Sequence, residues 1–251
     1  MIDEILARLK QKHRTAPFPF KNIKLSDRYN GFPEIKNPPY QKIEDIIKIC
    51  PVDALINDNG KLKLDMGLCI FCGKCSKKFP EYIKFTKDYS LSVSKREDLI
   101  ISEDFCKKSV ILREEIYKLF GRSLKLRQVS AGGCNACEAD CNVLSTPFFD
   151  MARFGISFVA SPRHADGILI TGPVTKNMHL ALRKTYDAVP EPKIVIAVGA
   201  CAISGGIYRG LEQIKGIDSD IKIDLFIPGC PPHPMTILDG LLRFIGKISN
   251  I

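Results

Sequence analysis

The sequence predicts an α/β protein, in which a smaller α+β unit precedes a parallel sheet with covering helices. Short apolar runs rich in β-branched residues recur in the second half of the chain, as is typical of buried parallel strands. These runs alternate with segments that favour helix, which argues for a parallel sheet. Strands are expected at 124–130, 156–160, 166–171, 194–199 and 223–227. Helices are expected near 140–153, 175–187, 209–214 and 234–247.

Cysteines follow three of these strands. Cys134 and Cys137 come after the first, Cys201 after the run 194–199, and Cys230 after the last. Functional groups of an open α/β sheet gather beyond the carboxyl ends of its strands, so these four thiols can converge. Four thiolates suit zinc or an iron–sulfur cluster, and buried core thiols are the other interpretation. Glycines beside the cysteines favour a bound group, because glycine lets the backbone approach a bulky object.

Five motifs carry a family resemblance over about residues 124–245. They are Gly132-Gly-Cys-Asn-Ala-Cys-Glu138, Ser161-Pro-Arg-His-Ala-Asp166, Thr171-Gly-Pro-Val-Thr175, Val198-Gly-Ala-Cys-Ala-Ile-Ser-Gly-Gly206 and Ile227-Pro-Gly-Cys-Pro-Pro232. Together they resemble the small subunit of [NiFe] hydrogenases, most closely that of the membrane-bound energy-converting group and formate hydrogenlyase. The 20 kDa subunit of NADH:quinone oxidoreductase is in the same family.

This resemblance implies a flavodoxin-like sheet that holds one [4Fe–4S] cluster. The implied ligands are Cys134, Cys137, Cys201 and Cys230. Quinone-reducing members of the family carry two adjacent cysteines. This chain has Cys-x-x-Cys instead, which is the hydrogenase form.

A second cysteine set lies earlier in the chain. Cys69, Cys72 and Cys75 have the Cys-x-x-Cys-x-x-Cys spacing, and Cys50 precedes Pro51. In two-cluster ferredoxins the Cys-Pro of one motif ligates the cluster that the other motif holds. The ligand positions of the second cluster hold no cysteine; Tyr40, Ile43, Ile46 and Phe79 stand there. The segment therefore resembles a ferredoxin-like domain that has kept one [4Fe–4S] cluster, with zinc as the alternative.

Four segments are expected along the chain. Residues 1–40 form an amphipathic helix over 1–14 and then an extended, proline-rich arm. Residues 41–100 form the ferredoxin-like domain, with a hairpin over 82–93. Residues 101–123 form a connecting helix over 103–120, which ends at Gly121. Residues 124–251 form the hydrogenase small-subunit-like domain.

The charge of the chain is +9 and is concentrated in its first half. Residues 1–123 carry 24 Lys and Arg against 17 Asp and Glu. Such a region attracts acidic electron carriers or acidic membrane surfaces, and a solvated lysine-rich surface without a partner is the other interpretation. No nucleic-acid motif accompanies the charge, so nucleic acid is not an expected partner.

The ten cysteines and the absence of a secretion signal indicate metal binding in a reducing cytoplasm. No apolar run reaches the ~20 residues that span a bilayer. The chain is thus expected on the cytoplasmic side of a membrane, held there through a complex.

Five further residues have open roles. Glu138 is expected to be a solvated or salt-bridged carboxylate, with a proton-path role as the alternative. The resemblance implies that Arg163 and His164 lie near the second cluster and the large-subunit interface, with plain interface or capping roles as the alternatives. Cys106 and Cys141 are expected to be structural thiols.

The resemblance implies an electron-transfer subunit without catalytic residues of its own. It would relay electrons between a ferredoxin, or a ferredoxin-like subunit, and the [NiFe] site of a large subunit, during H2 evolution or uptake. Membrane subunits would be indirect partners. The alternatives are the cluster subunit of a complex I-like oxidoreductase without nickel, and a freestanding iron–sulfur or zinc protein.

Overall fold

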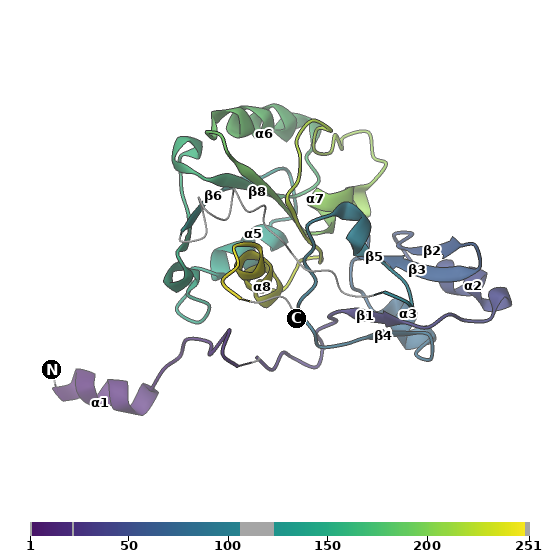
Figure 1. Ribbon diagram of the computed structural model, residues 1–251, viewed down its shortest axis with the longest axis horizontal. Helices are drawn as coiled ribbons and strands as arrows, with labels where there is room; N and C mark the ends of the chain where they lie inside the picture. The colour runs from purple at the N-terminus through teal and green to yellow at the C-terminus, as the bar shows by residue number, and fades with distance from the viewer. Residues whose placement is uncertain (1, 22, 106–122, 249–251) are drawn as a thin grey trace.

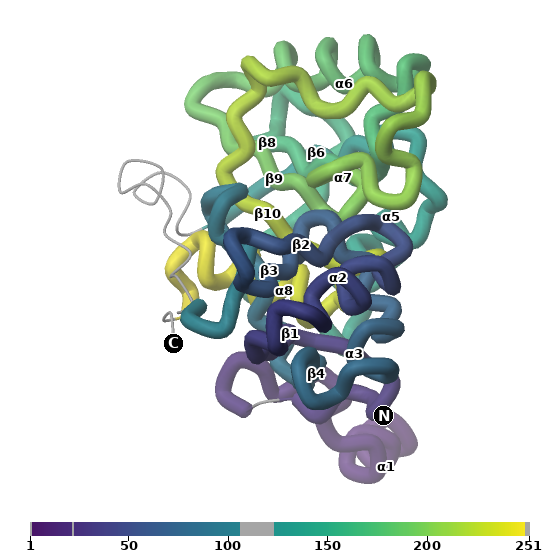
Figure 2. The backbone as a smooth tube through the Cα atoms, turned by 90° about the vertical axis from the view of Figure 1, so that its right-hand side faces the viewer, coloured from purple at the N-terminus to yellow at the C-terminus, as the bar shows by residue number. Residues whose placement is uncertain are grey.

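A computed structural model describes residues 2–21, 23–105 and 123–248. The expected connecting helix over 103–120 lies almost wholly outside these residues, as does Cys106. Figures 1 and 2 label most of the helices and strands.

The second half of the chain forms the expected parallel sheet. Its strands are β6 (Leu124–Ser130), β7 (Ile156–Phe158), β8 (Gly167–Thr171), β9 (Ile194–Val198) and β10 (Leu225–Ile227). Their spatial order is β10-β9-β8-β6-β7, and every pairing is parallel. Numbered within the sheet, this is the order 2-1-3-4-5 of flavodoxin-like folds, so the predicted fold class is confirmed.

Helices cover both faces of this sheet, and alternate strand residues divide between two apolar clusters. Leu169 of β8 packs with α5 (Ala136–Val143) and α8 (Pro234–Phe244). Its neighbours Ile168 and Ile170 belong to the cluster that includes residues of α6 (Lys176–Ala188) and α7 (Ala200–Ser204). Burial on both faces explains why these strands are continuous apolar runs.

Two of the helix predictions are wrong in their positions. The helix expected near 140–153 begins earlier, at Ala136, and ends at Val143; a separate 3-10 turn, η2 (Met151–Phe154), follows. Pro147 disfavours helical geometry in the residue before it, which keeps the two apart. No helix forms over 209–214, where Gly210 has a φ of +81°. The helix in this region is instead the short α7, followed by η4 (Gly206–Tyr208).

The first half forms a smaller unit in the order β-α-β-β-α-β. The elements are β1 (Pro33–Ile35), α2 (Tyr40–Ile47), β2 (Leu55–Asp58), β3 (Lys61–Asp65), α3 (Lys74–Lys78) and β4 (Ile83–Phe85). β2 and β3 form a hairpin, β5 (Ile100–Ile101) joins β3, and β1 pairs antiparallel with β4. The hairpin expected over 82–93 is wrong, because β4 takes its partner from residues 33–35 instead.

The smaller unit packs against the parallel sheet. One apolar cluster holds Leu64 and Leu99 of the small unit together with Phe226 of β10, and Val93 forms a backbone bridge to Phe226. Figure 2 shows β2 and β3 in front of the β10 side of the sheet. The shared core fixes the two units relative to each other.

The N-terminal helix α1 (Ile2–Gln11) is amphipathic, as expected, and has no buried residue. It projects from the body in Figure 1 and lies at the opposite end from α6 in Figure 2. The segment after it does pack: Phe18 and Leu25 are buried, and Arg153 donates hydrogen bonds to the carbonyls of Ala16 and Phe18.

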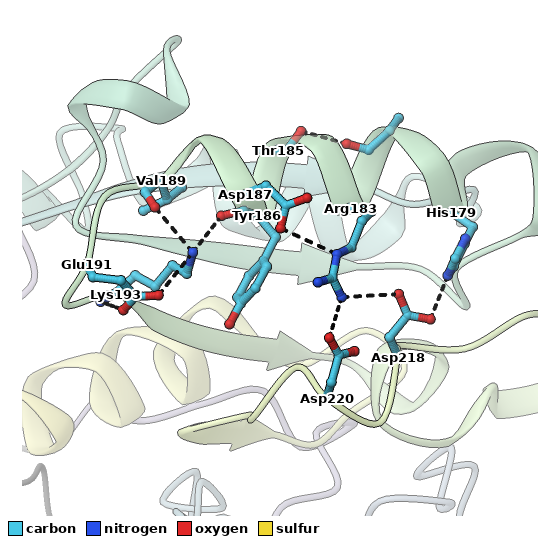
Figure 3. A network of polar contacts seen from close by, with 11 residues as sticks. His179, Arg183, Thr185, Tyr186, Asp187, Val189, Glu191, Lys193, Asp218 and Asp220 are labelled. Atoms are coloured by element: carbon cyan, nitrogen blue, oxygen red, sulfur yellow. Dashed lines mark hydrogen bonds and ion pairs between the residues drawn. The ribbon is translucent and has the colours of Figure 1, made fainter.

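A polar network ties α6 to the loop that leads into β10 (Figure 3). Asp218 accepts a contact of 2.6 Å from His179 Nε2, and Arg183 contacts Asp220 at 2.6 Å. The same Arg183 is paired with Asp187 on its own helix. The loop runs between the segments that carry Cys201 and Cys230, so the network restrains the chain between two candidate ligands.

Candidate metal centres

The first cysteine set surrounds one hollow of the small unit. Cys50 follows α2, Cys69 follows β3, and Cys72 and Cys75 flank the start of α3. All four line one small hollow. Cys69 is buried and Cys72 is exposed, so this first site lies under the surface and opens to it on one side.

Backbone geometry turns these thiols inward. Phe71 has a φ of +53° and Gly73 a φ of +70°, so the chain reverses between Cys69 and Cys75. A positive φ is unusual for a bulky residue such as Phe71 and marks a constrained site. The backbone N–H of Phe71 donates to Cys69 Sγ at 3.3 Å, and that of Ala54 donates to Cys50 Sγ at 3.2 Å. Such bonds stabilise a thiolate, and bonds to the sulfurs help to set the potential of a cluster.

Burial dominates the acid–base behaviour of the first site. It raises the pKa of Cys69, and it raises the pKa of Cys75 to about 11; the neighbouring thiols add to both effects. Metal-free, these two cysteines are therefore neutral thiols at pH 7. Binding a metal requires thiolates, so loading the site must release protons.

A half-buried ion pair lies beside the first site, and the sequence carried no signal of it. Asp65 accepts two hydrogen bonds from Arg96, at 2.9 and 2.6 Å, and one from the Gly67 backbone N–H at 2.8 Å. Cys69 N–H also donates to the Asp65 carbonyl at 3.0 Å. This pair orders the turn that presents Cys69.

The second cysteine set lies at the carboxyl edge of the parallel sheet. Cys134 and Cys137 follow β6, Cys201 lies on α7 after β9, and Cys230 follows β10. The four thiols are close enough to affect one another electrostatically. Besides burial, the charge of Cys134 raises the pKa of Cys201 and of Cys230, and the charges of Cys201 and Cys230 raise the pKa of Cys137. The order of the strands reverses between β6 and β8, and the carboxyl edge at such a reversal is the usual ligand position of these sheets.

Glycines at this edge leave room only for the sulfur atoms. A Cβ on Gly199 would stand 2.6 Å from Cys137 Sγ, and one on Gly206 would stand 2.8 Å from Cys201 Sγ. Both glycines have a positive φ, as does Asn135 between the paired cysteines. The glycines noted in the sequence thus approach the thiols themselves.

Burial also raises the pKa of three thiols of the second set, which keeps those three neutral without metal. It raises the pKa of Cys137, with the Glu138 carboxylate as the next cause. It raises the pKa of Cys201 to about 11 and, together with the charge of Cys134, raises the pKa of Cys230. Cys134 and Cys230 are exposed, so this second site opens to the outside at the sheet edge.

Glu138 is buried rather than solvated, and hydroxyl groups rather than a cation contact its carboxylate, contrary to expectation. Its Oε1 accepts hydrogen bonds of 2.7 Å from the hydroxyls of Ser130 and Thr171. These two hydroxyls come from the carboxyl ends of β6 and β8, two adjacent strands. Sequence spacing carried no signal of them, because they meet Glu138 only across the sheet.

Two of the remaining singled-out residues lie apart from the thiols. Arg163 and His164 are exposed on η3 (Pro162–His164), which comes before β8, at its amino end. The expected position near the second cluster is therefore not supported, since the thiols lie at the carboxyl ends. Cys141 is fully buried on α5 in an apolar cluster, as a structural thiol would be.

The residues present fit iron–sulfur clusters in their chemistry. Each site offers four cysteines, the ligand set of a [4Fe–4S] cluster, and each shows backbone that approaches or donates to sulfur. Within the described residues, no three His, Cys, Asp or Glu side chains are placed to share a single metal ion.

Across 2–21, 23–105 and 123–248, no helix has the length and apolarity to cross a bilayer.

The two sites adjoin. Ser204, on the helix of Cys201, contacts the carbonyl of Gly67 at 2.9 Å through its hydroxyl. A second hollow is lined by Phe71 of the first site and Cys230 of the second. Gly67 stands two positions before Cys69, and Ser204 stands three positions after Cys201. The chain segments that carry the two cysteine sets are therefore in contact.

Comparisons with known proteins identify the family. The model of the NADH ubiquinone oxidoreductase 20 kDa subunit matches residues 134–244. The probable membrane-bound hydrogenase subunit mbhJ of Pyrococcus furiosus is 40% identical over 138 residues, which span 55% of this chain and 83% of that protein. Formate hydrogenlyase subunit 7 of Escherichia coli is 41% identical over 140 residues, 55% of each chain. An NADH-quinone oxidoreductase subunit of Citrifermentans bemidjiense is 45% identical over 118 residues, 47% of this chain and 69% of that one.

The fold, the thiol-bearing sheet edge and these relatives define a non-catalytic subunit of a respiratory or hydrogenase-type oxidoreductase complex. The chain belongs to the NADH ubiquinone oxidoreductase 20 kDa subunit family. The family predicted from the sequence motifs is thereby confirmed.

Proposed function

We propose that this chain is the iron–sulfur electron-transfer subunit of a membrane-bound, energy-converting [NiFe] hydrogenase. One observation carries the proposal: two complete sets of four cysteines, on different parts of the fold, adjoin through the contact between Gly67 and Ser204. The relatives named as hydrogenase and formate hydrogenlyase subunits support it.

Eight cysteines would hold two [4Fe–4S] clusters. Those of the first site are Cys50, Cys69, Cys72 and Cys75; those of the second are Cys134, Cys137, Cys201 and Cys230. When bound, the clusters would carry single electrons between a ferredoxin-type donor and the [NiFe] site of a large subunit, for H2 evolution or uptake. The domain boundaries at 40, 100 and 123 remain part of this proposal.

The residues around the thiols have roles that follow from their contacts. The N–H groups of Ala54 and Phe71 donate to sulfurs of the first site and favour their thiolate form. Asp65 and Arg96 hold the turn before Cys69. The shared apolar core prevents the two sites from moving apart, and short, constant separation is what electron transfer between them needs.

The large subunit would cover the carboxyl edge of the sheet. Cys134 and Cys230 are exposed there, among glycines and prolines that offer little side chain to shield a cluster. Hydrogen exchange should therefore slow over 130–138, 199–206 and 228–233 when the large subunit is present. Equal exchange with and without that subunit would contradict the interface.

A second candidate is the cluster subunit of a complex I-like oxidoreductase without nickel. The 45% identity to an NADH-quinone oxidoreductase subunit favours it. The Cys-x-x-Cys of Cys134 and Cys137, in place of adjacent cysteines, favours the hydrogenase. In either case the chain would sit on the cytoplasmic side of the membrane, held through other subunits.

The metal content and activity of the native complex test these alternatives. Anaerobically purified protein should hold about eight iron and eight acid-labile sulfide per chain, four of each per cluster. Nickel in the partner and H2 evolution would support the hydrogenase; an active complex without nickel would favour the complex I-like relative. A chain that purifies alone, or holds stoichiometric zinc, would contradict the proposal.

A further inference from the structure

We infer that the lysines around the first site form a docking surface for a small acidic electron-carrier protein. The inference rests on the proposed function, because it names the partner from which that site would receive electrons. We define the lysine patch as Lys48, Lys74, Lys77 and Lys78. All four side chains are exposed.

The patch lies on the two chain segments that carry the cysteines of the first site. Lys74 lines the cavity of the four cysteines and neighbours the exposed Cys72 in space and sequence. Lys77 and Lys78 lie in the last turn of α3, two and three residues after Cys75. Lys48 ends α2, two residues before Cys50. Positive charge therefore stands on both chain segments that carry the cysteines.

These charges are little compensated by the chain itself. Among the described residues, no carboxylate lies within ion-pair distance of the four lysines, whereas Lys61 and Lys63 pair with Asp104 and Asp58. Residues 66–80 contain three lysines and no Asp or Glu. Asp45 borders the hollow that Lys48 and Lys78 line, so one acidic side chain lies among them.

An aromatic ring lies among the patch lysines. Phe79 lines that hollow together with Lys48 and Lys78, and Lys78 Nζ lies 5.7 Å from the Phe79 ring centroid. Pro51 and Pro80 are exposed beside it. A few apolar groups among charged side chains suit weak, transient complexes, in which charge sets the encounter rate more than the affinity.

The position of the patch identifies the kind of partner. A membrane surface or a nucleic acid would also attract lysines, but neither delivers electrons to a buried cysteine site. A carrier protein with a carboxylate-rich face around its own redox group would meet both requirements. Its approach would bring that group beside Cys72, the most open of the first four thiols.

Charge variants test this surface. The patch variant is Lys48→Gln, Lys77→Gln and Lys78→Gln together. Its matched control is Lys184→Gln, Lys215→Gln and Lys222→Gln, which removes the same charge from exposed lysines on and near α6. Figures 1 and 2 both show α6 far from α3. All six substituted lysines are exposed, so both variants should fold and keep their iron.

The measurement is stopped-flow reduction of the anaerobically prepared full chain. The donors are a reduced acidic bacterial ferredoxin and, separately, the small neutral radical of photoreduced 5-deazaflavin. The patch variant should be reduced by ferredoxin about tenfold more slowly than wild type at low ionic strength, and the control at the wild-type rate. The difference should fade near 1 M salt, where charges are screened beyond ~3 Å. Deazaflavin should reduce all three proteins equally.

Other results would overturn the inference in distinguishable ways. Equal ferredoxin rates for the patch variant and its control, with normal deazaflavin reduction, would remove the docking surface but leave the proposed function. No reducible cluster in wild type would remove both. Loss of binding to phosphatidylglycerol vesicles in the patch variant, with an unchanged ferredoxin rate, would assign the lysines to a lipid surface.

Discussion

Replacing Gly199 with alanine should remove the metal from the second site and leave the first intact. Gly199 follows β9 with φ +89° and ψ 155°, a conformation that is almost confined to glycine. An added Cβ would stand 2.6 Å from Cys137 Sγ. Non-bonded carbon atoms rest about 3.5–4.0 Å apart, so the thiol or the turn would have to move by about 1 Å.

Two costs combine at this position. The backbone conformation costs about 1–3 kcal/mol for a residue with a side chain. The crowding costs a further 1–3 kcal/mol or so if nothing moves. Displacing the Cys137 sulfur relieves the crowding, but it takes a ligand out of the site. We therefore expect iron to fall from about eight to about four per chain, with the spectrum of the first cluster retained.

Gly210→Ala is the matched control. Gly210 has a similar φ of +81°, but an added Cβ would meet no atom within 4 Å. This variant should lose about 1–2 kcal/mol of stability through its backbone and keep all its iron. Iron analysis measures the metal content, electron paramagnetic resonance of the reduced protein shows whether the first cluster is retained, and thermal unfolding measures the stability. Full iron content in Gly199→Ala, or equal loss in both variants, would refute the reasoning.

Three other predictions concern ligands and titration. Cys50→Ser should halve the iron content, whereas Cys141→Ser, in an apolar cluster, should keep all of it; full iron in Cys50→Ser would show that the first site is misassigned. Arg183 lowers the pKa of Asp220, so this pair stabilises the fold above pH 3.8 and the effect is lost as pH falls through the folded pKa. Arg183→Gln should raise the Asp220 pKa, measured by NMR, and its stability deficit should vanish in acid; an unchanged pKa would contradict the pairing. Burial raises the pKa of Tyr29 to about 12. The neutral phenol therefore stabilises the fold below pH 10, and this stabilisation is lost as the pH rises toward 12. Tyr29→Phe should cost about 1 kcal/mol at pH 7 and lose less stability than wild type between pH 10 and 12, as measured by denaturant unfolding.

Local sequence determined the strands and the cysteine sets. Runs such as Ile194–Val198 could be recognised because both faces of a parallel strand are buried, so every residue is apolar. The spacing of Cys69, Cys72 and Cys75 is a local property as well, and it predicted a common site that the structure gathers around one hollow. Whether metal binds there remains a prediction.

Helix limits and non-local pairings could not be predicted in this way. The position of α5 depends on the left-handed Asn135, whose φ is +69°. The partner of β4 comes from β1, about fifty residues earlier, and a three-residue strand carries too little pattern to announce that pairing. Local propensity is weak compared with such tertiary contacts.

Tertiary structure alone decided the surroundings of the thiols. Glu138 is buried because Ser130 and Thr171, from two adjacent strands, supply the hydrogen bonds that its carboxylate needs. The two sites adjoin because Gly67 and Ser204 meet across a shared core. The sequence by itself determined which residues can bind metal, since ligand chemistry belongs to side chains and their spacing. Only the fold decided what stands beside each sulfur, because those neighbours come from distant parts of the chain.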